Sequence, residues 1–556
     1  MAVNLEGSQP LVSPGILPGR AIVDDLVSNR SREVQRMKVY EGTIISCDRE
    51  DHIYSHLIED RGRILHVGHE LPEAYRGAPR EALGTRALLP SFGDTHLHFA
   101  SHALFSAGLD VRSARSLPEM SDRIRKFAQE NRDAIIMGFG ASTHSVQEKR
   151  LISRKELDRA CPDRAVFIVK YDGHACIVNG KMIDLLPRRL KALRGWHEET
   201  GEMNQEAFFA VTDFVTKKVS LPRTIRNMLR AVDAMAGKGF GMMHTVSGVG
   251  FPLDLDVTME TILGRGLDSG FQSRLFFQTM DLAKVKKRKL PRVGGCFATA
   301  LDGCFGSEDA ALRQPYSNNP QNRGVLFYSD ETVIDFVKRA NRAGLQIEMH
   351  AIGDAAFEQA VLAIETALKD FPRQDHRHGI IHACLPTEEG LETCARLGVQ
   401  IPLQPAFLYW DLEPAEFVQS LLGKRAEGIL PLRKMTDMGI MLSGGSDAPC
   451  TLPDPIAGIH AACNHPVPGQ SLTIPEALKL FTWNAAWTAF DERERGSLEV
   501  GKIADMVILN RNPLTMKPGD LLGLKVENLL LKGEPYRGGQ GMASLLFRGL
   551  RSGGKI

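Results

Sequence analysis

Short apolar runs alternate with helix-like segments through the middle of the chain, as in the amphipathic stretch 331–340. The runs lie at residues 87–92, 134–137, 165–169, 240–244, 274–278, 295–297, 345–350, 380–382, 399–403 and 440–443. Repeated strand–helix units of this extent favour an α/β fold with a (β/α)8 TIM-like barrel over an open sheet. More runs occur than a barrel needs, so one or two must lie outside it. No glycine-rich phosphate-binding fingerprint follows an early strand, which argues against a dinucleotide-binding fold.

Both ends of the chain show shorter strand patterns. Near the start, residues 38–46, 55–60 and 63–68 read as strands, and the turn at 60–62 predicts a hairpin. Near the other end, strands are expected within 501–509 and 526–533. Neither group can bury a core alone, so we expect one small β-sandwich domain built from N- and C-terminal segments. The predicted organisation is a tail at 1–35, the first part of the β domain at 36–89, the barrel at 90–494, and the second part of the β domain with a C-terminal tail at 495–556.

The composition narrows the class of protein. A net charge of +1 over 556 residues offers no electrostatic basis for binding nucleic acid or an anionic membrane surface. Nine cysteines without a Cys-x-x-Cys pair indicate reduced thiols and a cytoplasmic protein. No apolar stretch reaches the length of a membrane span, and no secretory signal is recognised. The expected partner is a small-molecule substrate, and a homo-oligomer is compatible with the sequence.

The apolar run 87–92 leads directly into Asp94-Thr95-His96-Leu97-His98. Histidines at positions i and i+2 of a strand point to the same face. At the C-terminal end of a barrel strand, that face opens into the mouth where barrel enzymes place their active sites. Two neutral imidazoles directed at one point suit a divalent metal such as zinc.

Three further residues with metal-binding side chains follow later strand-like runs: His350, His382 and Asp447. Each has an ordinary alternative, because the histidines could be hydrogen-bonded core residues and the aspartate could cap a helix. Four histidines and an aspartate at successive strand ends are less easily explained by those alternatives. The sequence therefore predicts a site for one or two divalent ions, with zinc expected and manganese as the alternative.

Several segments, in order, resemble the amidohydrolase superfamily, specifically the branch that includes N-substituted formamide deformylase. The resemblance extends over roughly residues 36–545 and rests on segments 90–98, 170–174, 350–354, 382–383, 445–449 and 501–505. It implies hydrolysis of a non-peptide C–N bond, an amide, by metal-activated water. The same scaffold could instead catalyse a deamination or a decarboxylation.

The resemblance also implies roles for individual residues. His96 and His98 would bind a buried metal, and His350 and His382 a second, more exposed one. Asp447 would contact a metal and act as the general base. His174, in the segment Tyr171-Asp172-Gly173-His174, would contact substrate or stabilise an oxyanion, with a purely structural histidine as the alternative.

One position departs from the family pattern. Many relatives carry a carbamylated lysine on the fourth strand, four residues before an Asp-Gly pair, and this lysine bridges two metals. Counting back from Asp302-Gly303 places Ala298 there, and a methyl group cannot bridge cations. Three readings follow: the site holds one metal, another residue bridges, or the chain is a catalytically impaired metal- or ligand-binding relative. The candidates for the bridge are Lys170, Cys296 and Asp302.

Two further segments are candidates for the walls of a substrate pocket. Phe407, Tyr409 and Trp410 follow a predicted strand and could line an apolar pocket or simply pack a loop. The long insertion at 185–216 could cover the mouth of the barrel.

Overall fold

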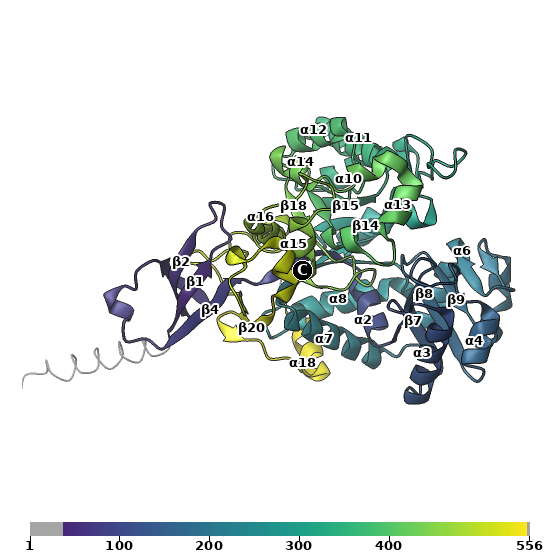
Figure 1. The fold of residues 1–556 in the computed structure, drawn as a ribbon, viewed down its shortest axis with the longest axis horizontal. Helices are drawn as coiled ribbons and strands as arrows, with labels where there is room; N and C mark the ends of the chain where they lie inside the picture. Colours follow the sequence, from purple (N-terminus) through teal and green to yellow (C-terminus); the bar gives the residue numbers. More distant parts are fainter. Residues whose placement is uncertain (1–36, 553–556) are drawn as a thin grey trace, which may run out of the picture.

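Eight parallel strands form the centre of the molecule (Figure 1). The computed structural model describes residues 37–552, so the tail predicted for 1–35 lies outside the described residues. The eight strands are β5 (Phe92–Leu97), β12 (Phe240–Ser247), β13 (Gln272–Phe277), β14 (Arg292–Ala300), β15 (Gln346–Ala351), β16 (Gly379–His382), β17 (Ile401–Leu403) and β18 (Leu442–Gly444). The first six are neighbours in one sheet and the last two form a parallel pair.

Backbone contacts join these two sets of strands into a barrel. A parallel bridge between Gly379 and Gln400 connects β16 to the start of β17. On the other side, the Asp447 N–H, just after β18, donates to the carbonyl of His96 in β5 at 2.8 Å. Strand order therefore follows chain order around the ring, and the predicted (β/α)8 barrel is confirmed.

Helices link successive strands and cover the outside of the barrel. In α10, Val333, Phe336 and Val337 recur at helical spacing and are buried, while Ser329 caps the N-terminus by accepting from the Thr332 N–H. None of the helices within residues 37–552 combines the length and apolar character needed to cross a bilayer. The helices associated with the barrel are α2 (Phe99–Ser106), α7 (Leu221–Gly237), α8 (Leu255–Gly266), α9 (Leu282–Lys287), α10 (Asp330–Arg342), α11 (Asp354–Asp370), α12 (Glu388–Leu397), α13 (Ala415–Leu422), α14 (Leu432–Asp437), α15 (Pro455–Cys463), α16 (Ile474–Leu480), α17 (Trp483–Thr488) and α18 (Met542–Arg551).

A second sheet is inserted between α2 and α7, on the side of the barrel away from the chain's first strands (Figure 1). The apolar runs at 134–137 and 165–169 belong to this sheet and are the two runs in excess of the eight barrel strands. In β8, Phe167 and Val169 face one hydrophobic core, while Val166 and Ile168 face another. Burial on both faces produces the same continuous apolar run as a barrel strand, so periodicity could not separate them. The strands are β6 (Leu109–Asp110), β7 (Ile135–Ala141), β8 (Ala165–Lys170), β9 (Ala175–Val178), β10 (Trp196–His197) and β11 (Glu202–Asn204), with helices α3 (Leu117–Glu130), α4 (Arg154–Ala160), α5 (Gly180–Leu185) and α6 (Gln205–Thr216).

The two ends of the chain meet in a small β unit, as predicted (Figure 1). Its seven-stranded sheet brings together strands from both ends around one shared core that includes Leu57 and Ile508. The sheet curls back on itself, because Arg63 in β3 forms an antiparallel bridge with Ile503, just before β19. The strands are β1 (Lys38–Ile45), β2 (Ile53–Asp60), β3 (Arg63–Gly68), β4 (Arg80–Pro90), β19 (Met506–Leu509), β20 (Val526–Leu531) and β21 (Glu534–Pro535).

Candidate metal centre

The His-x-His pair lies at the C-terminal end of β5, immediately before α2. His96 is fully buried, and His98 lines the cavity at the mouth of the barrel. Asp94 fixes this segment, because its Oδ1 accepts from the backbone N–H of His96 at 3.2 Å and of Ser446 at 3.0 Å. Those bonds tie the first barrel strand to the segment that follows the last one.

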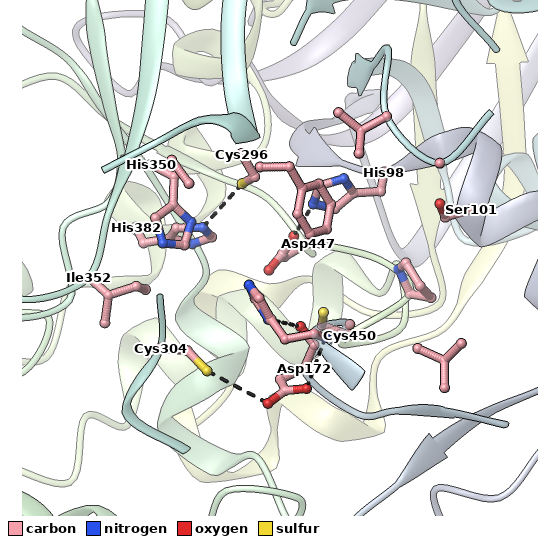
Figure 2. Close-up of a pocket in the computed structure, with 18 of the residues that line it drawn as sticks. His98, Ser101, Asp172, Cys296, Cys304, His350, Ile352, His382, Asp447 and Cys450 are labelled. Carbon is pink, nitrogen blue, oxygen red and sulfur yellow. Dashed lines mark hydrogen bonds and ion pairs between the residues drawn. The ribbon is translucent and has the colours of Figure 1, made fainter. Parts of the chain in front are cut away.

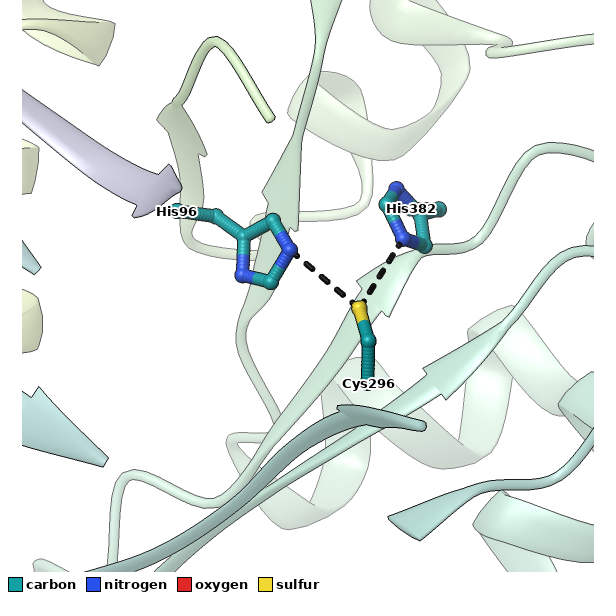
Figure 3. A group of neighbouring side chains, drawn as sticks. All are labelled: His96, Cys296 and His382. Atoms are coloured by element: carbon teal, nitrogen blue, oxygen red, sulfur yellow. Dashed lines mark hydrogen bonds between the residues drawn. The ribbon is translucent and has the colours of Figure 1, made fainter. Parts of the chain in front are cut away.

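Four of the predicted residues converge with a cysteine at this end of the barrel. Figure 2 shows His98, His382, Asp447 and Cys296 around the cavity, and Figure 3 shows His96. Asp447 Oδ1 lies 3.4 Å from His96 Nε2 and 3.3 Å from His98 Nε2. Cys296 Sγ, from β14, lies 3.3 Å from His96 Nε2 and 3.6 Å from His382 Nε2 (Figure 3). His96 is therefore shared by two groups of potential ligands.

Hydrogen bonds orient the other two histidine rings. His382 Nδ1 lies 2.5 Å from Gln404 Oε1. Because an amide oxygen only accepts, the ring proton is assigned to Nδ1, and Nε2, which faces Cys296, is then unprotonated. His350 Nε2 lies 3.0 Å from the carbonyl of Gly303, which by the same reasoning leaves Nδ1 unprotonated. The rings of His350 and His382 are neighbours, with centroids 4.6 Å apart. Both rings thus offer a lone pair inside the site.

The protonation states of His96, His382 and Asp447 suit a cation, whereas at His350 burial is outweighed by Asp302 and the Gly303 carbonyl, which raise the pKa of that imidazole. Burial lowers the pKa of His96 and of His382, which keeps both imidazoles neutral near pH 7. Burial alone would raise the pKa of the Asp447 carboxyl, but the adjacent His96 and His98 imidazoles hold it well below its usual range. Neutral imidazoles beside an ionised carboxylate are the ligand states that a divalent metal requires.

Two further observations test whether the residues fit a metal. Two buried atoms of the site, His350 Nδ1 and Asp447 Oδ1, have no hydrogen-bond partner among residues 37–552. Nitrogen and oxygen atoms bound to one tetrahedral zinc lie about 3.4 Å apart. The separations of Asp447 Oδ1 from His96 and His98 match that value. The donor set therefore fits a divalent cation.

Of the three candidates for the bridge, only Cys296 lies among these ligands. Ala298 does not line the cavity, and its carbonyl accepts from the Tyr328 hydroxyl at 3.1 Å. Lys170 Nζ forms an ion pair with Asp172 at 2.8 Å. Asp302 accepts three backbone N–H bonds and lies 3.5 Å from His350 Nε2, so it orients that ring from behind.

The cavity above the metal ligands has a volume of about 130 Å³ and mainly apolar walls. Phe407 and Trp410 line it and stack on each other, whereas Tyr409 is half-exposed and outside the lining. Helix α6, within the insertion expected to cover the mouth, contributes Phe208 and Phe209. Sequence reasoning missed Phe105, Phe139, Phe297 and Phe305, because nothing local separates a pocket aromatic from a core aromatic.

His174 lines the same cavity as Asp447, and its Nδ1 lies 2.7 Å from the carbonyl of Asp172. The Asp172 carboxylate accepts from Lys170 Nζ and from Ser307 Oγ, each at 2.8 Å. These bonds, with burial opposing them, lower the pKa of the Asp172 carboxyl to about 2. With an N–H on Nδ1, the neutral His174 ring accepts at Nε2 and donates there only when protonated.

Gln404, the residue after β17, can be used to test whether its hydrogen bond orients the His382 ring toward the metal. Replacing it with leucine should weaken metal affinity by about 10–100-fold, because His382 loses the acceptor that fixes its tautomer. Competition with a metal-sensitive chelating dye measures the affinity, and Gln404→Glu, which keeps an acceptor oxygen, is the matched variant. Unchanged affinity in Gln404→Leu would remove this residue from the centre.

A closed parallel barrel with histidines and an aspartate gathered at its strand ends defines a class of metal-dependent hydrolases. Residues 82–536 match the sequence profile of the amidohydrolase family, and the chain belongs to that family.

Individual relatives match along nearly their whole length. YtcJ of Bacillus subtilis is 27% identical over 521 residues, which cover 88% of this chain and 96% of the relative. N-substituted formamide deformylase of Arthrobacter pascens is 23% identical over 534 residues, covering 89% and 97%. The crystal structure of an uncharacterised metal-dependent hydrolase from Pyrococcus furiosus superposes with a TM-score of 0.69 at 27% identity, covering 86% of this chain and all of that one.

Proposed function

We propose that the protein hydrolyses the C–N bond of a small-molecule amide that carries an apolar, aromatic substituent. One observation carries the proposal: the ligand cluster around Asp447 opens into a cavity whose mainly apolar walls include eight Phe and Trp side chains. A polar reacting centre beneath an apolar chamber fits a substrate with a carbonyl at one end and a ring at the other. The similarity to N-substituted formamide deformylase supports a formamide as the first substrate to test.

Five residues would hold the metal: His96, His98, His350, His382 and Asp447. Zinc is the proposed ion, with manganese as the alternative. A divalent cation bound there lowers the pKa of water from 15.7 to about 7 and polarises a carbonyl oxygen.

The protein's own groups complete the chemistry. Asp447 takes the proton from the attacking water and passes it to the leaving nitrogen, so that one water and one amide give a carboxylic acid and an amine. Protonated His174 donates from Nε2 to the oxygen that develops negative charge. The aromatic walls exclude bulk water around the substituent and hold the amide over the ligand cluster.

The test is hydrolysis of N-substituted formamides by purified protein before and after metal removal. We expect formate and the free amine in equal amounts, loss of turnover on dialysis against a chelator, and recovery on adding zinc or manganese. N-benzyl substrates should have a higher kcat/KM than N-methyl ones, because only the benzyl group fills the aromatic chamber.

Other products would contradict the proposal. Release of ammonia from ring amines would assign a deaminase, and release of carbon dioxide a decarboxylase. Protein that binds metal but converts no member of a broad amide panel would be a ligand-binding relative instead.

A further inference from the structure

We propose that the thiolate of Cys296 bridges two divalent cations between two groups of ligands: His96, His98 and Asp447 on one side, and His350 and His382 on the other. The inference rests on the metal centre of the proposed function, although not on its substrate. In this proposal, a cysteine takes the position between the two cations that a carbamylated lysine occupies in many relatives.

The backbone of β14 aims the cysteine at the site. Gly295 pairs with Met349 and Ala300 with His350, so residues 296–299 bulge out of the ladder. Gly294 and Gly295 have φ of +113° and +127°, and a Cβ on Gly294 would lie 1.9 Å from the Glu348 carbonyl oxygen. This conformation places the consecutive residues Cys296 and Phe297 both on the cavity wall, which a regular strand cannot do.

The separations match shared metal ligation. A sulfur at about 2.3 Å and a nitrogen at about 2.0–2.1 Å from one tetrahedral zinc lie about 3.6 Å apart. Cys296 Sγ lies 3.3 Å from His96 Nε2 in one group and 3.6 Å from His382 Nε2 in the other (Figure 3). The sulfur is thus within ligand spacing of one histidine from each group.

Charge balance requires an anion at this place. Two divalent cations bring four positive charges, and the four histidines are neutral ligands, so Asp447 alone offsets only one of them. Lys170 is paired with Asp172, and Asp302 points its carboxylate to backbone N–H groups. Cys296 is the remaining group of the described cluster that can supply a second negative charge.

Binding is a simple exchange at sulfur. The S–H bond breaks, two sulfur–metal bonds form, and the proton leaves to the buffer, with no change of oxidation state.

Cobalt substitution of the full chain tests the bridge directly. Native protein stripped of metal and titrated with Co²⁺ should bind two ions per chain and develop a near-ultraviolet thiolate-to-cobalt absorption band. The Cys296→Ala and Cys296→Ser variants should lack the band and bind one ion at most. Cys450→Ala is the matched control, because Cys450 lines the same cavity outside the ligand groups, and it should keep the band.

The possible outcomes distinguish failure of the Cys296 bridge from failure of the proposed amide hydrolysis. A band that persists in Cys296→Ala, or native protein that binds cobalt without a band, overturns the proposal, and so does a band accompanied by only one ion per chain. A zinc-edge X-ray absorption spectrum of native protein needs no variant and should show sulfur at about 2.3 Å. If the band and two ions are found but no amide is hydrolysed, the bridge stands and the proposed function fails.

Discussion

Replacing Asp447 with asparagine should lower kcat by about 10²–10⁴-fold, the range that a positioned proton-transfer group contributes. The carboxylate lies 3.4 Å from His96 Nε2 and 3.3 Å from His98 Nε2, where it can both contact a metal and receive the proton of the attacking water. An amide at the same position cannot accept that proton. The fold should tolerate the change, because Asp447 has φ of +55° and asparagine adopts this left-handed conformation readily.

Steady-state kinetics on the best formamide, together with circular dichroism and metal analysis, measures this effect. Asp437→Asn, in an exposed residue of α14, is the control and should behave as the native protein does. If Asp447→Asn retained turnover within a few-fold of native while remaining folded, Asp447 would not be the general base. Asp447→Ala should be no more active than the asparagine variant.

The barrel could be predicted because its strands have a recognisable local sequence pattern. Each strand is a short apolar run, and helices of clear amphipathic period, such as α10, separate many of them. Polar residues that end such runs, including His96, His350 and His382, are conspicuous because each directly follows apolar residues in the sequence. Strand ends of a parallel barrel converge, so residues separated by nearly three hundred positions could be assigned to one site from sequence.

Other features depend on contacts that no local pattern records. The runs in β7 and β8 are buried on both faces, like barrel strands, and only their pairing places them in the inserted sheet. Gln404 acts through a single hydrogen bond to His382 across two strands. A glutamine after a strand carries no signal for such a role.

The position of Cys296 shows what a count along the sequence leaves out. Counting back from Asp302 places Ala298 at the family's lysine position, but the count does not show which side chains of β14 face the cavity, and this strand bulges after Gly295. The glycine pair at 294–295 was the available signal, because glycines inside a strand often mark a bulge or a close approach of another backbone. If Cys296 bridges the cations as proposed, the departure from the family pattern is a displacement of the bridge along β14.

Replacing His96 with alanine should have the broadest effect on the metal centre, because His96 clusters with His98 and Asp447 on one side and with Cys296 and His382 on the other. Losing it removes a neutral nitrogen from beside Asp447 and from beside Cys296 at once. Since a catalytic metal supplies several kcal/mol of transition-state stabilisation, kcat/KM should fall by about 10³-fold or more. Metal content per chain should fall with it.

Elemental analysis and kinetics on the same preparation measure both effects, and His102→Gln is the matched control. His102 is a buried histidine of α2, four residues after His98, and it does not line the cavity. The control should keep native metal content and turnover. Native-like metal content and turnover in His96→Ala would show that His96 does not bind the metal. Loss of turnover with full metal content would instead assign His96 to positioning of Asp447, since the carboxylate would then have lost the neighbouring imidazole without loss of the ion.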